Sequence, residues 1–285
     1  MRMRFSPAIV AGVLFALVSA GPVQAIGATV GATAYYLALG DSLARGVQPD
    51  SGGADVETTQ GYVDDLYALY RAEIPGLQVV KLGCPDETTT TMIHGGGRCN
   101  YPLGSQLAQA VDFLKTHRVV LVTIDIGANN VDQCLRNGID ENCIASGFAT
   151  APAELSDILT ELRGARRGVL IVGMNYYDPF LAAWLQGPEG RALAAASEQL
   201  TVAFNGLLGS VYGAFGVPVA DVQSAFQTTN STPVPPFGVP VNVILVCSWT
   251  WMCAPAPVGP NIHANVVGYW VIAGSFAKVI GVLRR

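Results

Sequence analysis

Four polar positions, three with polar side chains and one with a glycine backbone amide, supply the groups that acyl transfer requires. Ser42, Gly83 and Asn129 each lie just after a strand-like apolar run, and His263 lies just before the last helical pattern. A serine hydroxyl can attack a carbonyl carbon, an imidazole can accept its proton, and amide N–H groups can stabilise the oxyanion that forms. Each residue alone also fits an ordinary role as a helix cap or a turn residue. Together they predict an acyl-transfer site if the fold brings them into one place.

The elements that must position these residues alternate along the chain. Continuous apolar runs, typical of strands buried on both faces, occupy 35–39, 77–82, 119–126, 169–173 and 217–220. Helical patterns lie at about 61–73, 104–117, 152–164, 188–213 and 265–283. This alternation predicts an α/β fold over residues 35–285, with a five-stranded parallel sheet covered by helices on both sides.

Ligands of an open parallel sheet bind outside the carboxyl ends of its strands. Ser42, Gly83 and Asn129 all follow such ends, so we expect them at one edge of the sheet. Asp41 and Asp125 lie at the same strand ends and are interpreted as acids that stabilise the turns.

Two long loops leave the same edge, at residues 83–103 and 221–262. Loops of this length inside a compact domain are usually functional. The second loop contains Trp249 and Trp251, for which two interpretations remain open. The two tryptophans either belong to a small core closed by nearby cysteines, or they form an apolar wall that binds the acyl chain of a substrate.

The segments around the four polar positions resemble the sequence blocks of the SGNH (GDSL-type) hydrolases, particularly secreted actinobacterial members. The blocks are YLALGDSL at 36–43, KLGCPDETTTTM at 81–92, DIGANN at 125–130 and IHANVVGYWVIA at 262–273. The resemblance covers essentially the whole mature chain and implies a three-layer αβα, flavodoxin-like fold.

The resemblance also assigns roles to individual residues. It implies that Ser42 is the nucleophile and His263 the general base, and that the Ser42 amide, Gly83 and Asn129 form the oxyanion hole. Gly268 would let the last helix pack closely. Neither a metal nor an organic cofactor is implied.

The last block departs from the family pattern at the position of the orienting acid. An Asp usually stands two or three residues before the histidine, where this chain has Asn261 and Pro260. We therefore predict a Ser42–His263 dyad whose imidazole is oriented by a nearby backbone carbonyl or by the Asn261 side chain. Asp221, at the end of the fifth strand, is a more distant alternative.

Residues 1–25 have the pattern of a secretory signal peptide. Arg2 and Arg4 form a basic start, 8–20 is an apolar run of 13 residues, and small residues precede a cleavage site after Ala25. A membrane anchor is the alternative, but a span needs about 20 apolar residues. A tail of small residues, 26–34, would then precede the catalytic domain, and the mature protein would be secreted and extracellular.

Six cysteines follow the predicted signal peptide, and an even number in an exported chain indicates disulfide bonds. Pairing of nearest neighbours predicts Cys84–Cys99, Cys134–Cys143 and Cys247–Cys253. The sequence alone permits other pairings. A zinc site is the rival interpretation, but it is disfavoured because no CxxC pair occurs and the three histidines lie far apart.

Composition limits the classes of function. The 285 residues are 51% hydrophobic and 13% charged, which excludes a disordered, collagen-like or coiled-coil protein. The 16 Lys and Arg residues against 21 Asp and Glu leave no basic footprint for nucleic acid.

These observations predict a secreted carboxylic ester hydrolase, an esterase or lipase that works through a serine acyl-enzyme. The apolar last loop favours apolar acyl groups, so the expected substrates are small-molecule or lipid esters. A monomer with transient contact to lipid surfaces is expected. The alternatives are a cell-envelope protein that binds glycans or lipids with little or no turnover, and an acyltransferase or deacetylase that uses the same site.

Overall fold

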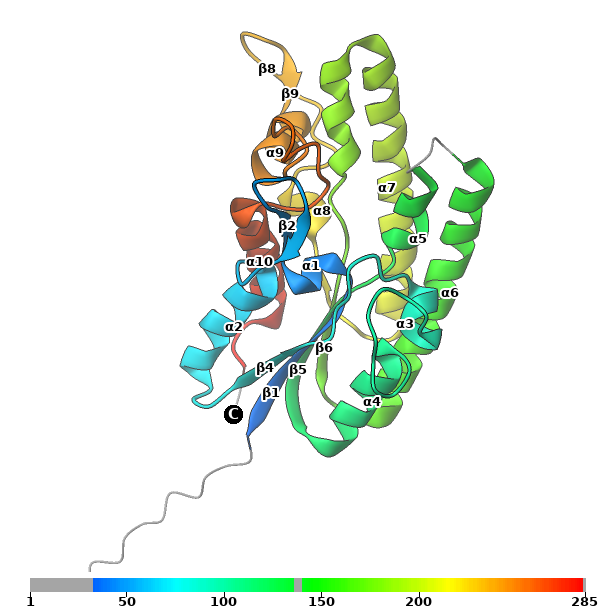
Figure 1. The fold of residues 1–285 in the computed structure, drawn as a ribbon, viewed down its shortest axis with the longest axis vertical. Helices are drawn as coiled ribbons and strands as arrows, with labels where there is room; N and C mark the ends of the chain where they lie inside the picture. Colours follow the sequence, from blue (N-terminus) through cyan, green and yellow to red (C-terminus); the bar gives the residue numbers. More distant parts are fainter. Residues whose placement is uncertain (1–32, 136–139, 284–285) are drawn as a thin grey trace, which may run out of the picture. The chain divides into compact units, whose positions relative to one another are not determined.

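A computed structural model describes residues 33–135 and 140–283. Its centre is a parallel sheet whose five strands lie in the order β4-β1-β5-β6-β7 (Figure 1). The strands are β1 Ala34–Gly40, β4 Gln78–Lys81, β5 Arg118–Asp125, β6 Leu170–Met174 and β7 Val219–Ala220. The strand order reverses direction between β1 and β5, and the crevice at such a reversal is where open sheets bind ligands.

Helices cover both faces of the sheet, as Figure 1 shows. On one face, α2 (Tyr62–Glu73) packs against α10 (Val266–Ile280), and the rings of Tyr62 and Phe276 stack 4.8 Å apart. The other face carries α4 (Gln106–Thr116), α6 (Glu141–Ala165) and α7 (Pro188–Ala214). These layers give the α/β fold with the five-stranded parallel sheet that the sequence predicts.

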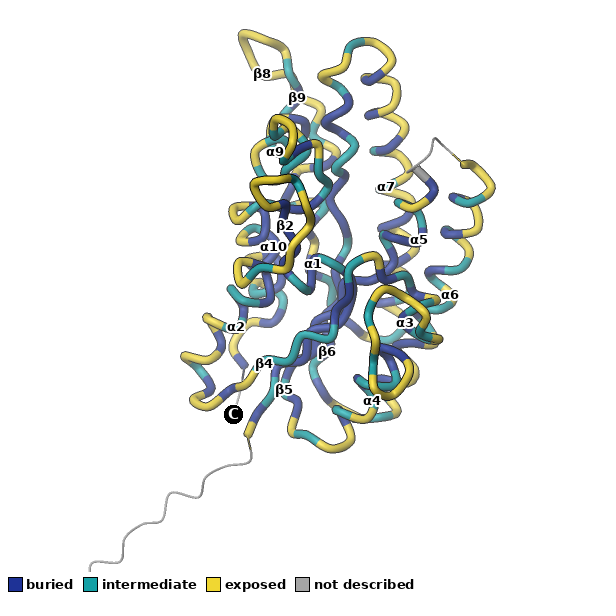
Figure 2. The backbone as a smooth tube through the Cα atoms, viewed as in Figure 1, coloured by how far each residue is buried: buried dark blue, intermediate teal, exposed yellow. Residues whose placement is uncertain are grey.

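The three central strands β1, β5 and β6 are largely buried on both faces because most of their side chains are apolar, whereas the edge strand β4 is partly exposed. Leu37, Val122 and Ile171, from the three central strands, are fully buried, and Figure 2 shows these strands in the buried colour. Removing such a side chain from water contributes roughly 1.5–3 kcal/mol. Among the polar groups of these strands, the Tyr36 hydroxyl lies 2.8 Å from Thr123 Oγ1 on the neighbouring strand.

Shorter elements were not predicted. The two long loops contain α3 (Thr89–His94) and α9 (Val241–Trp249), and α6 begins at Glu141 instead of near residue 152. The remaining short elements are α1 Ser42–Arg45, β2 Val47–Pro49, β3 Asp55–Glu57, α5 Asn129–Asp132, η1 Gln133–Leu135, η2 Pro179–Gln186, α8 Val222–Ala225, β8 Pro233–Val234 and β9 Val239–Pro240. Segments of two to nine residues carry too little periodicity to be recognised before their tertiary contacts are known.

The three predicted disulfides are confirmed. The Cα atoms are 5.9 Å apart in Cys84–Cys99, 5.5 Å in Cys134–Cys143 and 4.9 Å in Cys247–Cys253. All six cysteines lie within the described residues and are paired in these three bonds. Each bond closes a segment that follows the carboxyl end of a strand.

The predicted signal peptide lies outside the described residues, as does most of the predicted tail. Within residues 33–135 and 140–283, none of the helices is long and apolar enough to cross a membrane.

Candidate active site

Ser42 and His263 meet at the carboxyl end of β1, although 221 residues separate them in the sequence. Ser42 is the first residue of α1, and His263 lies in the loop that leads into α10. The distance from His263 Nε2 to Ser42 Oγ is 2.9 Å. This is the contact that a general base needs in order to take the proton of a serine nucleophile.

The turn between β1 and α1 fixes the position of Ser42. Gly40 has a φ of 130°, and a Cβ at this position would lie 2.1 Å from Asp125 O, so only glycine fits. Asp41 caps α1, because its Oδ1 accepts from Leu43 N at 2.9 Å. Asp125 Oδ2 accepts from Ala44 N at 3.1 Å. Both acids therefore stabilise the turn, as the sequence predicts.

Asp41 and Asp125 form a buried carboxyl pair beneath the nucleophile. Burial raises the pKa of Asp41 to about 6. Burial together with the charge of Asp41 raises the pKa of Asp125 well above its usual value, and the Tyr62 hydroxyl donates to Asp125 Oδ1. The two carboxyl groups share a hydrogen bond, and they do not both ionise readily. The pair therefore retains a proton at moderately acidic pH.

The expected oxyanion donors surround the Ser42 turn. Gly83 packs against it so closely that a Cβ would lie 2.6 Å from Ala44 Cβ and 2.9 Å from Asp41 O. Within the described chain, the backbone N–H groups of Ser42 and Gly83 donate to no protein acceptor. Asn129 Nδ2 donates to Glu87 O at 3.0 Å, which fixes the orientation of its amide and leaves its second hydrogen available.

The imidazole of His263 is oriented from the side opposite to Ser42. Its Nδ1 lies 2.8 Å from Asn261 Oδ1, which also accepts from His263 N at 3.0 Å. Asn261 is thus placed where the sequence predicts an orienting group. Asp221 is elsewhere: it caps α8 through Ser224 N and accepts from Asn175 Nδ2.

Residues 38–271 match the sequence profile of the GDSL-like lipase/acylhydrolase family. The chain belongs to this family. Among curated protein sequences none matches the chain.

Solved structures show the same fold at low sequence identity. An extracellular lipase from Streptomyces rimosus aligns at 19% identity and a TM-score of 0.57, over 87% of this chain and 100% of the lipase. A variant of an acetyl xylan esterase from Geobacillus stearothermophilus aligns at 18% identity and a TM-score of 0.54, over 90% of this chain and 97% of the esterase. A GDSL-like lipase structure from Parabacteroides merdae aligns at 14% identity and a TM-score of 0.57, over 88% of this chain and 97% of the other.

A cavity opens beside the Ser42–His263 pair of this GDSL-like family member. Its polar end contains Ser42, Asn129 and His263. The remainder is largely apolar and extends between α6, α7 and η2. The apolar lining includes Val131, Ile144, Phe148, Phe180, Leu200 and Phe204.

Trp249 and Trp251 do not line this cavity. Trp249 packs edge-on against Phe226, with ring centroids 5.1 Å apart, and Trp251 Nε1 donates to Gln48 Oε1 at 3.3 Å. The backbone of Trp251 is bonded to the histidine loop, since Trp251 N donates to His263 O at 3.0 Å. The structure therefore favours the small-core interpretation of the two tryptophans, and the expectation that they contact the acyl chain does not hold for this cavity.

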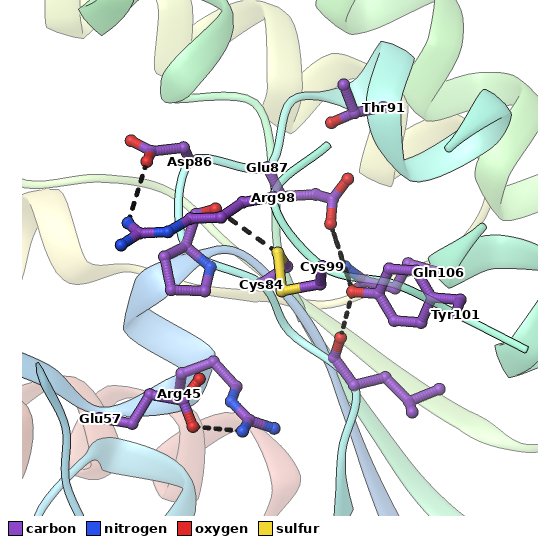
Figure 3. The surroundings of a disulfide bond; sticks show 12 residues. Arg45, Glu57, Cys84, Asp86, Glu87, Thr91, Arg98, Cys99, Tyr101 and Gln106 are labelled. Atoms are coloured by element: carbon purple, nitrogen blue, oxygen red, sulfur yellow. Dashed lines mark hydrogen bonds and ion pairs between the residues drawn. A yellow bond between two sulfur atoms is a disulfide. The ribbon is translucent and has the colours of Figure 1, made fainter. Parts of the chain in front are cut away.

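Glu87 and Gln106 support the site but were missed in the sequence, and Figure 3 shows them beside the Cys84–Cys99 disulfide. Gln106 Nε2 donates to Gly40 O at 3.0 Å and to Glu87 Oε2 at 3.1 Å, and Gly40 N donates to Gln106 Oε1. Glu87 is buried, which raises its pKa. Glu87 lies in the second block and Gln106 in the predicted helix 104–117, but nothing in the sequence indicates that the two side chains meet.

Asp55 was also missed. It lies on β3, 206 residues before Asn261, and its Oδ1 accepts from Asn261 Nδ2 at 2.7 Å.

Among the described residues, no group of three His, Cys, Asp or Glu side chains is arranged to hold a metal ion.

Proposed function

We propose that this protein is a secreted carboxylic ester hydrolase, an esterase or lipase, that forms an acyl-enzyme at Ser42. The observation that carries the proposal is the 2.9 Å contact between His263 Nε2 and Ser42 Oγ at the polar end of an apolar cavity. Membership of the GDSL-like lipase/acylhydrolase family supports the same chemistry.

The geometry supports a two-step reaction. Ser42 Oγ attacks the ester carbonyl carbon while His263 Nε2 takes up the hydroxyl proton. The tetrahedral oxyanion is bound by the Ser42 and Gly83 N–H groups and by Asn129 Nδ2. The C–O bond then breaks, and the alcohol leaves with the proton from His263. In the second step water attacks the acyl carbon while His263 takes its proton, the bond from the acyl carbon to Ser42 Oγ breaks, His263 returns the proton to Oγ, and the carboxylic acid is released.

The cavity supports a preference for apolar acyl groups. Its apolar lining includes Phe148, Phe180 and Phe204, and an alkyl chain placed beside these rings would leave water. Ser197, Thr201 and Asn205 also line the cavity, but its apolar residues predominate. Substrates with an alkyl acyl chain are therefore proposed ahead of acetylated sugars.

Export is supported by the three disulfide bonds, because such bonds persist in oxidising compartments. The apolar run at 8–20, with its basic flank, supplies the signal that export requires.

The first test is hydrolysis of p-nitrophenyl esters from acetate to palmitate. We expect turnover by the wild type and no measurable turnover by Ser42→Ala, while Ser210→Ala, on the exposed face of α7, keeps the wild-type rate. An alkyl phosphonate should label wild type stoichiometrically at Ser42. A folded wild type that neither hydrolyses any ester nor reacts with the phosphonate would instead be a binding protein.

A further inference from the structure

We propose that Asp55, on the β2–β3 hairpin, is the positioning carboxylate of the catalytic histidine and acts through Asn261. This proposal rests on the proposed serine hydrolase function and names the acid that the last sequence block lacks. Asp55 Oδ1 lies 2.7 Å from Asn261 Nδ2 and 3.5 Å from His263 Nδ1.

The hydrogen bonds fix both the amide orientation and the imidazole tautomer. Asn261 Oδ1 faces two nitrogens of His263, the backbone N at 3.0 Å and Nδ1 at 2.8 Å. Its Nδ2 faces the Asp55 carboxylate. Rotating the amide by 180° would place N–H against N–H and oxygen against oxygen. Nδ1 therefore carries the proton in neutral His263, and Nε2 is left as the acceptor that faces Ser42.

The charge of Asp55 matters when His263 becomes an imidazolium. A neutral amide can hold the tautomer, but it stabilises a cation less than a carboxylate does. Hydrogen bonding to His263 is the largest cause that lowers the pKa of Asp55, so the carboxylate is ionised at neutral pH. The Asp55 side chain is 40% exposed, which weakens but does not remove its attraction for the imidazolium.

The hairpin that carries Asp55 is fixed against the histidine loop. Gly53, with a φ of 86°, has its Cα so near Pro257 that a Cβ would lie 2.0 Å from Pro257 O. Gln48 accepts from Trp251 Nε1, and Trp251 O accepts from Asn261 N. Asp55 therefore has a defined place relative to His263.

Other charged groups face the same site. Asp41 interacts with His263 from the β1–α1 turn, and Arg98 interacts with Asp55 from the 83–103 loop. Glu57, two residues along β3, is paired with Arg45 and serves as the matched acidic control.

The test compares Asp55→Asn with Glu57→Gln on a p-nitrophenyl ester. We expect Asp55→Asn to lower kcat/KM by about tenfold to a hundredfold and to move the midpoint of the acid limb of its pH profile downward, because the imidazolium loses its counter-charge. Glu57→Gln should stay within about twofold of wild type with an unmoved acid limb.

A second experiment moves the carboxylate from position 55 to position 261. In the Asp55→Asn background, Asn261→Asp places the acid directly at Nδ1, and both the rate and the acid limb should move back toward wild type. A wild-type rate and pH profile in Asp55→Asn would overturn the proposal, and so would a double variant as slow as Asp55→Asn with the same acid limb.

An NMR titration keeps this outcome separate from failure of the proposed function. The midpoint for the His263 ring proton should fall in Asp55→Asn whether or not any ester is turned over. An unmoved midpoint would overturn the positioning role even in an active enzyme, whereas a lowered midpoint in a protein without esterase activity would reject only the proposed function.

Discussion

At the scale of single residues, neighbouring asparagines have separate tasks. Asn129 lines the cavity, whereas Asn130 Oδ1 accepts from Thr89 N and its Nδ2 donates to Thr89 Oγ1. Asn129→Ala should lower kcat by about 10²–10³, because one oxyanion donor is lost. Asn130→Ala should instead lower the free energy of unfolding by about 1–3 kcal/mol with little change in kcat. Steady-state kinetics and urea unfolding of both variants would show the separation, and equal kcat values would contradict it.

The sequence predicted the residues whose type alone defines their chemistry. Ser42, Asn129 and His263 stand just after a strand end or just before the last helix, and the structure brings all three to one cavity. Asp55 could not be found, because its role comes from a contact across 206 residues between a short hairpin and a loop. An exposed aspartate in a short strand has no pattern that distinguishes it from other surface acids.

At the scale of elements, the start of α10 must approach α9 closely in order to place the histidine loop. A Cβ at Gly268 would lie 2.0 Å from Trp249 O, while one at Gly274, on the same helix, would meet nothing within 4 Å. Gly268→Ala should therefore destabilise the fold by about 1–3 kcal/mol and lower kcat. Gly274→Ala should be neutral or stabilise by up to about 1 kcal/mol. Thermal unfolding and ester turnover would test both, and equal effects would contradict the close packing.

The cap of η2 predicts a pH dependence of stability. Asp178 Oδ1 accepts from Phe180 N and Oδ2 from the Ser197 hydroxyl, and burial raises the pKa of Asp178 to about 6. Because the folded-state pKa exceeds the unfolded value, stability is lost as pH rises from about 4 to about 6. Asp178→Asn should remove this loss, so its free energy of unfolding relative to wild type should rise by about 2–3 kcal/mol between pH 4 and pH 7. Urea unfolding of both proteins at several pH values measures this difference. A difference that does not change with pH would refute the assignment.

Element prediction succeeded where burial creates a continuous pattern. All five strands of the sheet were predicted within about two residues of their bounds, and the three central ones have the long apolar runs that burial on both faces requires. The β2–β3 hairpin and α9 were missed. Val56 of the hairpin is exposed, and α9 is almost uniformly apolar, so neither shows the alternation or amphipathic spacing that sequence reasoning uses.

At the scale of the whole molecule, the three disulfides lie outside the central strands of the described sheet, although Cys84 and Cys134 are buried. All three bonds close segments beyond the carboxyl ends of the strands, whereas the sheet core of Leu37, Val122 and Ile171 contains no cysteine. Each bond stabilises by about 2–3 kcal/mol in the chain-entropy model. Reduction should therefore weaken the active-site edge more than the sheet.

This difference predicts two separate transitions in the reduced protein. With the disulfides intact, ester turnover and far-UV circular dichroism should be lost together on heating, as expected for one cooperative unit. After reduction, turnover should disappear at a lower temperature than the circular dichroism signal, because loops that hold Gly83 and His263 open locally before the sheet unfolds. Coincident loss of both signals in the reduced protein would mean that the site edge and the sheet remain coupled without the bonds.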